Sequence, residues 1–245
     1  METNDQVEAR LDKLQKLRET GINPYPYSFP ITHDSAALLR DRETLLASER
    51  LIAFAGRIVR YNLKGKIAFL HLKDGMGRLQ VMFGRDAVGE AGFELVKMFD
   101  IGDWIGVHGP MFITKTGEYS VRAQQVELLA KAVRPLPIPK EKIDEQGNKV
   151  IFDEFKDVET RYRQRYVDLT LNDSVRDVFL KRSRILQAIR KYLIDQEYLE
   201  VETPILQPIY GGANARPFTT HHNALDIPLY LRVSNELYLK RCIVG

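Results

Sequence analysis

The sequence predicts an α+β protein in which a helix and a small five-stranded barrel precede a second domain of helices and antiparallel strands. Three observations indicate this fold class. Apolar residues recur at helical spacing near the N-terminus, short alternating runs separated by glycines fill residues 51–129, and helical spacing returns after residue 157. A chain of 245 residues is also long enough for two domains.

Composition narrows the classes of protein to which the chain can belong. Cys242 is the only cysteine, so an intramolecular disulfide and a cysteine-based metal cluster are both excluded. The first residues are acidic and polar. The sequence contains no run of about 18 apolar residues, the length that a helix needs to span a bilayer. We therefore expect a cytoplasmic protein with no membrane partner. The formal net charge of +3 is too small to indicate a polyanionic partner by itself.

Residues 1–48 are predicted to form a helical extension. An apolar stripe at helical spacing stops shortly before Gly21, a residue typical of a helix C-cap, and consists of Val7, Leu11, Leu14 and Leu17. A second short helix is expected from Ala36 to Ala47.

Residues 49–133 are predicted to form the barrel. Five short apolar or alternating segments are expected to be strands: Ile52 to Val59, Ile67 to Leu72, Leu79 to Phe83, Trp104 to Val107, and Tyr119 to Leu128. A helical segment, Phe93 to Phe99, lies between the third and fourth. This is the order of the OB-fold, a Greek-key barrel that binds oligonucleotides over its second and third strands.

The second expected strand has two different faces. One face carries Ala68, Leu70 and Leu72, and the other carries Ile67, Phe69 and His71. We expect the aliphatic face to point into the core, so that the ring of Phe69 is exposed and could stack on an unpaired base. The alternative is that Phe69 is a core aromatic of the barrel.

Residues 134–156 are predicted to be a linker and an insertion. The linker reads RPLPIP at residues 134–139, and its prolines rule out a helix or a central strand. The insertion contains EQGN at residues 145–148, which has the turn chemistry of a hairpin tip.

Residues 157–245 are predicted to form the second domain. Its expected helices are Val158 to Leu169, Ser174 to Gln196, and a last helix capped by Ser234. Ser174 and Asp177 resemble a capping box at the start of the long helix. The expected strands are Tyr198 to Thr203, ending at Pro204, then Arg216 to Thr220 and Leu229 to Val233.

Several strings in this domain resemble the class II aminoacyl-tRNA synthetases. YLEVETP at residues 198–204 resembles motif 1 of that class. The others resemble its lysine-specific branch: RYRQRYVDL at 161–169, GGANARPF at 211–218, HHNALD at 221–226 and ELYLKR at 236–241. The resemblance covers nearly the whole chain. It implies an anticodon-binding OB-fold followed by the first part of an antiparallel-sheet catalytic domain.

The resemblance to lysyl-tRNA synthetases also implies an activity. Such an enzyme activates lysine with ATP and Mg²⁺, transfers it to the acceptor end of tRNA(Lys), and forms a homodimer with Pro204 at the interface. In the family, motif 2, motif 3 and the magnesium-binding acidic residues follow the position of Gly245. We therefore expect the chain to be a fragment that is inactive alone and holds no catalytic residue. The alternative is a non-catalytic anticodon-binding protein or regulatory fragment.

The resemblance assigns Phe69, Gln80 and Glu118 to the central uridine of the lysine anticodon. A uracil edge offers an N3–H donor beside carbonyl acceptors, which an amide and a carboxylate can read. Without the resemblance, Gln80 and Glu118 would be ordinary surface residues. Arg57, on the first strand, could hold a phosphate, stack on a base, or be a solvated arginine.

The resemblance assigns Gly212 and Glu236 to the lysine substrate. The carbonyl at Gly212 would receive the α-ammonium group, and Glu236 would be its anionic partner. Paired glycines also suit a simple turn, and an acidic residue favours the first turn of any helix. His221 and His222 are neighbours on a strand and point to opposite faces, so we expect no metal site there.

Overall fold

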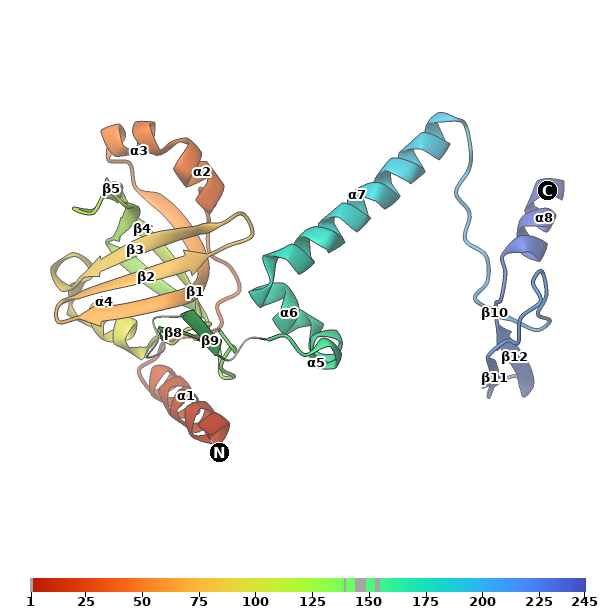
Figure 1. Cartoon of the computed structure of the whole chain (residues 1–245), viewed down its shortest axis with the longest axis horizontal. Helices are drawn as coiled ribbons and strands as arrows, with labels where there is room; N and C mark the ends of the chain where they lie inside the picture. The colour runs from red at the N-terminus through yellow and green to blue at the C-terminus, as the bar shows by residue number, and fades with distance from the viewer. Residues whose placement is uncertain (1, 139, 144–148, 153–154) are drawn as a thin grey trace. The chain divides into compact units, whose positions relative to one another are not determined.

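The computed structural model describes residues 2–138, 140–143, 149–152 and 155–245 (Figure 1). The chain divides into two compact units, Met1–Val167 and Asp168–Gly245. Among the described residues, no helix is both long enough and apolar enough to cross a membrane.

The N-terminal extension contains three helices. In α1 (Glu2–Glu19), Leu14 and Leu17 are buried, and Gly21, with φ of +78°, follows its end. The amide of Ile22 bonds back to the carbonyl of Leu17, as expected for a glycine C-cap. The expected second helix is two helices, α2 (Ser35–Arg40) and α3 (Arg42–Ser48), because Asp41 between them leaves helical geometry.

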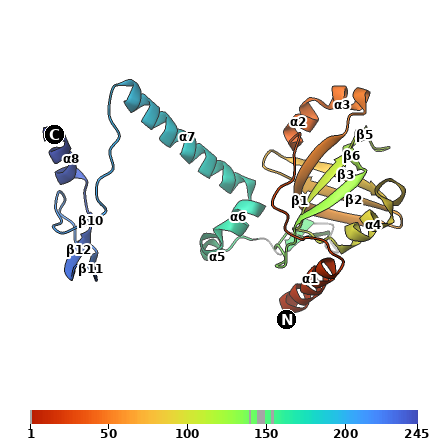
Figure 2. The same ribbon diagram turned by 180° about the vertical axis from the view of Figure 1, so that it is seen from behind.

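Seven strands form the sheet of the first unit, in the order β5-β6-β3-β2-β1-β4-β7. They are β1 (Ile52–Lys64), β2 (Ile67–Lys73), β3 (Arg78–Gly84), β4 (Trp104–Gly109), β5 (Met111–Ile113), β6 (Tyr119–Ala123) and β7 (Gln125–Ala130). The strands wrap around a common core, and α4 (Arg85–Met98) lies beside them (Figures 1 and 2). The pair β3–β6 is parallel, and the others are antiparallel.

The fourth strand, expected from Trp104 to Val107, is β4, and β5 is a further strand that the sequence analysis did not predict. The fifth strand, expected from Tyr119 to Leu128, is divided into β6 and β7. Pro110, which has no amide donor, separates β4 from β5, and its carbonyl accepts a hydrogen bond from Arg122 at 2.9 Å. Gln124 separates β6 from β7, and its amide bonds to the carbonyl of His108 at 2.8 Å. These breaks let β4 and β7 extend the sheet beyond β1 while β5 and β6 extend it beyond β3. The OB-fold order, with a helix between the third and fourth expected strands, is confirmed.

The core of the barrel is aliphatic and aromatic, with Phe54, Phe83, Phe93 and Ile105 almost completely buried. Ala68, Leu70 and Leu72 on β2 are fully buried, whereas Ile67 is exposed and Phe69 and His71 are partly exposed. The predicted face assignment of β2 is therefore confirmed.

After the barrel, β8 (Lys140–Ile143) and β9 (Lys149–Phe152) form an antiparallel hairpin. The predicted turn at residues 145–148 lies outside the described residues. The single helix expected over residues 158–169 is two helices, α5 (Val158–Arg163) and α6 (Arg165–Leu171), because Gln164 has non-helical φ and ψ of −112° and 52°.

The C-terminal unit contains one long helix, a small sheet and a short helix. Its elements are α7 (Asp173–Asp195), β10 (Leu206–Gln207), β11 (Thr219–His222), β12 (Ile227–Leu231) and α8 (Glu236–Val244). The sheet has the antiparallel order β10-β12-β11. The capping box predicted at Ser174 is wrong, because the N-cap residue of α7 is Asn172. At α8 the N-cap residue is Asn235, while Ser234 Oγ accepts a hydrogen bond from the amide of Glu236.

The strand predicted from Tyr198 to Thr203 is also wrong, since these residues form no strand. Side chains hold the end of this segment instead of a backbone ladder. Arg232 Nη1 donates to the carbonyl and to Oγ1 of Thr203, each at 2.8 Å, and Thr203 Oγ1 donates to Asn235 at 3.0 Å. These side-chain bonds therefore hold the end of the segment at residues 198–203 without a neighbouring strand.

Candidate functional site

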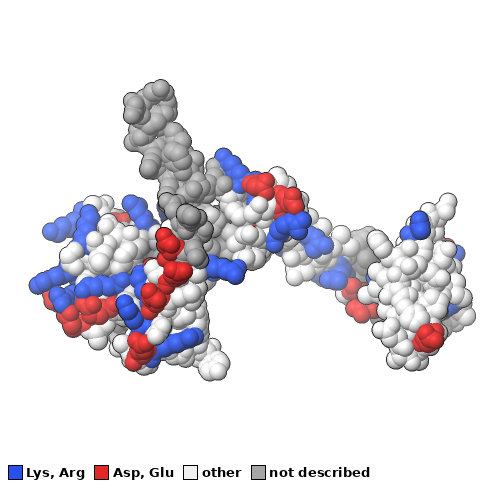
Figure 3. Space-filling view, turned by 90° about the horizontal axis from the view of Figure 1, so that it is seen from below, with Lys and Arg blue, Asp and Glu red and all other residues white. Residues whose placement is uncertain are grey.

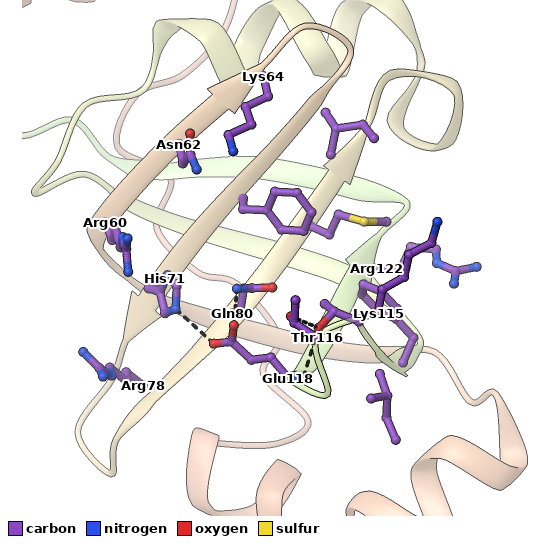
Figure 4. A pocket seen from close by; sticks show the side chains of 16 residues that line it. Arg60, Asn62, Lys64, His71, Arg78, Gln80, Lys115, Thr116, Glu118 and Arg122 are labelled. Carbon is purple, nitrogen blue, oxygen red and sulfur yellow. Dashed lines mark hydrogen bonds and ion pairs between the residues drawn. The ribbon is translucent and has the colours of Figure 1, made fainter.

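The outward faces of β1, β2 and β3, together with β5, β6 and the turn at residues 114–118, line a groove of about 1000 Å³ (Figure 4). Cross-strand pairing arranges its side chains in two rows. One row contains Asn62, Phe69, Met82 and Arg122, and the next contains Arg60, His71, Gln80 and Ser120. Glu118 joins them from the turn, so the groove brings Phe69, Gln80 and Glu118 together.

A chain of side-chain hydrogen bonds fixes the polar end of the groove. Ser120 Oγ donates to Gln80 Oε1 at 3.0 Å, and Gln80 Nε2 donates to Glu118 Oε2 at 2.6 Å. The other carboxylate oxygen of Glu118, Oε1, lies 3.1 Å from His71 Nε2. Gln80 is only 9% exposed, whereas the side chain of Glu118 is 46% exposed. Glu118 is therefore the member of this chain most open to a ligand, and it can only accept hydrogen bonds when ionised.

A tight turn places Glu118 at the rim of the groove. The amide of Gly117 bonds to the carbonyl of Thr114 at 2.9 Å, and the amide of Glu118 bonds to Thr114 Oγ1 at 3.0 Å. Gly117 has φ of +84°, a region that favours glycine. The sequence of this turn therefore determines the position of the Glu118 carboxylate.

Five cations line the groove: Arg60, Lys64, Arg78, Lys115 and Arg122. None of them forms an ion pair within the described part of the chain. The guanidinium of Arg122 lies 4.8 Å from the ring centre of Phe112, a second aromatic in the groove. Basic and acidic side chains are interspersed over the barrel on the face drawn in Figure 3. The five groove cations give this surface a local positive charge that would attract phosphates.

Arg57 lies apart from the groove. On β1 it pairs with Lys73 of β2 and with Trp104 of β4. Its Nη1 donates to the carbonyl of Gly102 at 3.1 Å, and its guanidinium lies 5.3 Å from the ring centre of Trp104. Burial lowers the pKa of Arg57 from its usual value. The guanidinium of Arg57 thus has one hydrogen bond and one ring contact within the barrel itself.

Gly212 and Glu236 are adjacent in the C-terminal unit. Gly212 has φ of +85°, and a Cβ on it would come within 3.1 Å of the Cβ atoms of Ser234 and Glu236. The glycine loop therefore lies against the first turn of α8. The carboxylate of Glu236 pairs with Lys240 at 2.6 Å, so a bound ammonium group would have to share or replace that lysine.

Pro204 is exposed between α7 and β10, and its carbonyl accepts a bond from Gln207 at 3.3 Å. His221 bonds to Asp226 at 3.0 Å, whereas His222 accepts a bond from the amide of Leu225 at 3.2 Å. The two histidines thus have different partners.

The sequence analysis missed the five groove cations and Phe112. Strict alternation along β1 would have placed Arg60 and Lys64 on the same face as the buried Phe54 and Ile58, whereas an irregularity between Ile58 and Arg60 turns them outward. Alternation along β3 does place Arg78 on its outer face. Alternation could not have placed Arg122 beside these cations, because that position depends on the parallel pairing of β6 with β3.

Comparison with known proteins gives two matches to protein families. Residues 52–129 match the family of OB-fold nucleic acid binding domains, and residues 157–245 match the class II tRNA synthetases for D, K and N. The barrel with its groove falls in the first region, and the Gly212–Glu236 pair falls in the second.

Two relatives match almost the entire chain. The lysine–tRNA ligase of Christiangramia forsetii is 48% identical over 249 residues, covering 99% of this chain and 42% of the relative. The lysine–tRNA ligase of Bacillus subtilis is 47% identical over 249 residues, covering 100% of this chain and 48% of the relative. The chain spans less than half the length of these relatives. Together, the two regions and the whole-chain identity show that the chain belongs to the family of class II lysyl-tRNA synthetases.

Proposed function

We propose that the chain provides the anticodon-binding domain and part of the catalytic domain of a lysine–tRNA ligase. Such an enzyme joins lysine to tRNA(Lys) at the expense of ATP. The observation that carries this proposal is the convergence of Phe69, Gln80 and Glu118 in one groove, among five cations that form no ion pair with other described residues.

In this proposal, the barrel reads the central uridine of the anticodon. The base stacks on the partly exposed ring of Phe69, which lies one row from Gln80 and Glu118. The Glu118 carboxylate accepts the N3–H of uracil, and the second hydrogen of the Gln80 amide is free for a carbonyl oxygen. The groove cations hold phosphates on either side of the base. The anticodon contact predicted for Arg57 stays a prediction, since this side chain lies outside the groove and bonds to Gly102.

Binding of an anticodon stem-loop tests the proposal. We expect the 245-residue chain to bind a stem-loop of tRNA(Lys) and expect Phe69→Ala to weaken the binding about 5- to 150-fold, since stacking on one base is worth about 1–3 kcal/mol. Tyr27→Ala is the matched control, because Tyr27 is fully exposed and lies outside the groove. Unchanged binding by folded Phe69→Ala would refute the assignment.

The C-terminal unit contributes to the lysine site in this proposal. The carbonyl of Gly212 and the carboxylate of Glu236 would together receive the α-ammonium group of lysine. ATP and Mg²⁺ are the further ligands proposed for the enzyme. Among the described residues, no three His, Cys, Asp or Glu side chains gather to hold a metal ion, so we assign no magnesium ligand to them.

We further propose a cytoplasmic homodimer. The support for a dimer is the exposed apolar side of α7, and Pro204 follows that helix. The proposed organisation is a helical extension at residues 1–48, the anticodon-binding barrel at 49–133, a linker and insertion at 134–156, and the partial catalytic domain at 157–245.

A further inference from the structure

His71 faces the groove from β2, on the same side of the strand as Phe69. Its cross-strand neighbours are Arg60 on β1 and Gln80 on β3. His71 Nε2 lies 3.1 Å from Oε1 of Glu118, and Gln80 donates to Oε2 of the same carboxylate at 2.6 Å. Two strands therefore hold the two oxygens of Glu118 separately.

The two ring nitrogens of His71 have different surroundings. An ionised carboxylate only accepts hydrogen bonds, so Nε2 must carry the proton in its bond to Glu118. Nδ1 is buried and has no hydrogen-bond partner in the described part of the chain. A proton on Nδ1 would be a buried donor without an acceptor, which is unfavourable. The geometry favours a neutral ring that is protonated at Nε2.

The bond from His71 restricts how the carboxylate can turn. A single bond from Gln80 would leave the carboxylate free to rotate about that contact, whereas two bonds to different oxygens define its plane. Such freedom would matter here, because Glu118 also lines a second, smaller hollow of about 310 Å³ together with Leu39 and Tyr119. The side chain of His71, the donor, is 15% exposed, whereas that of Glu118, the acceptor, is 46% exposed. The donor is therefore held by its surroundings, and the acceptor is open to a ligand.

We propose that His71 is a positioning residue that makes the groove selective for the edge of the bound base. Its Nε2–H holds the Glu118 carboxylate in one plane, with lone pairs directed at the ligand. The groove then accepts a base that presents an N–H donor beside a carbonyl, as uracil does. It rejects a base that presents a bare ring nitrogen there, as cytosine does, because two acceptors would face each other. This inference rests on the proposed function of the barrel.

Two substitutions separate the donor position from the size of the side chain. His71→Gln places an amide nitrogen near the position of Nε2, whereas His71→Asn places one near the position of Nδ1. The measurement is the affinity of the 245-residue chain for tRNA(Lys) anticodon stem-loops with uridine or cytidine at the centre. We expect His71→Asn to reduce the preference for uridine roughly tenfold, the size of one hydrogen bond to a charged group, and His71→Gln to keep most of it.

Three outcomes would overturn the inference. If His71→Asn keeps the preference while Glu118→Ala loses it, His71 does not position the carboxylate and the proposed function stands. If His71→Gln loses as much as His71→Asn, the position of the donor is irrelevant. If the unsubstituted chain does not prefer uridine, the proposed function fails together with the inference.

Nitrogen NMR of the ring provides a second measurement that requires no RNA. We expect His71 in the free chain to be protonated at Nε2 and expect this preference to be lost in Glu118→Ala. A ring protonated at Nδ1 in the unsubstituted chain would overturn the inference. Fluorescence of Trp104, the only tryptophan of the chain, shows whether each variant keeps a folded barrel.

Discussion

The barrel and the C-terminal unit differ in how they bury their apolar residues. In the barrel, the strands wrap around Phe54, Phe83 and Ile105, which are completely buried. In the C-terminal unit, α7 leaves apolar side chains in solvent, with Ile185 59% and Ile189 52% exposed. The barrel is therefore packed around a closed core, whereas the apolar side of α7 is exposed, as is typical of an interaction surface.

The two candidate sites show the same difference. Phe69, Gln80 and most other groove residues lie on paired strands, so the register of the barrel determines their spacing, and a tight turn between β5 and β6 adds Glu118. Gly212 and Glu236 come from a loop and from the first turn of α8, and Glu236 is still paired with Lys240. In the proposed function, recognition of a base therefore needs only residues of the barrel, whereas the proposed lysine site depends on a loop.

The largest effect should come from a substitution that prevents closure of the barrel. Gly109 ends β4, and a Cβ on it would overlap the backbone carbonyl of Arg122 on β6. We expect Gly109→Ala to reduce the free energy of unfolding by more than about 4 kcal/mol, because neither backbone can move without breaking the sheet. Chemical denaturation followed by Trp104 fluorescence measures this, since the chain has no other tryptophan.

Gly84→Ala is the control for this substitution. Gly84 ends β3 without a left-handed φ, and a Cβ on it would meet only the Cβ of Ala87 at 3.9 Å. We expect it to change stability by less than about 1 kcal/mol. If Gly109→Ala were as stable as this control, the close approach of β4 and β6 would not be what closes the barrel.

The same contrast between the two units explains what the sequence could reveal. Period-two alternation correctly placed Leu70 in the core and Phe69 on the outer face, because a closed barrel has one inside and one outside. The break between β4 and β5 at Pro110 follows from the missing amide of that residue, yet the closure that it permits requires Arg122, a distant partner. Local pattern therefore predicts the strands and their faces, and long-range pairing decides the groove.

The strand predicted from Tyr198 to Thr203 failed for a related reason. Alternating residues indicate a strand only when a neighbouring strand supplies hydrogen bonds, and here Arg232 and Asn235 hold Thr203 through side-chain bonds. Side-chain contacts of this kind produce no periodic pattern in the sequence, so they cannot be predicted from it. The convergence of Phe69, Gln80 and Glu118 was likewise inferred from the family resemblance rather than from any pattern.

A smaller effect should come from the exposed side of α7. If a second copy of the chain covers Ile189, then Ile189→Asp should raise the dissociation constant of the dimer more than about tenfold, because burial of an isoleucine contributes about 1.5–3 kcal/mol. Sedimentation at several concentrations measures this. Arg184→Ala, on the same helix, is the control for a charged position. An unsubstituted chain that is monomeric at all concentrations would contradict the proposed dimer, and Trp104 fluorescence should be unchanged in both variants.

The smallest effect concerns pH and Asp74, whose carboxylate ties the β2–β3 turn to the start of α2. It accepts bonds from the amide and hydroxyl of Ser35 and from the amides of Met76 and Gly77. Burial alone would raise the pKa of Asp74, but these hydrogen bonds outweigh it and lower the pKa below its ordinary value of 3.8. The folded protein therefore binds a proton at this group less readily than the unfolded chain does.

It follows that Asp74 stabilises the barrel fully at neutral pH and loses this contribution as the pH falls through 3.8 toward the pKa of the folded state. Because the group is partly exposed, we expect the contribution to be about 1 kcal/mol or less. The lowered pKa of Asp100 gives the whole barrel a similar trend, so the quantity to measure is the difference in unfolding free energy between the unsubstituted chain and Asp74→Asn. This difference should shrink as the pH is lowered from about 5 to about 3. A difference that stays constant over that interval would mean that the charge of Asp74 adds nothing to the bonds that an amide oxygen can also accept.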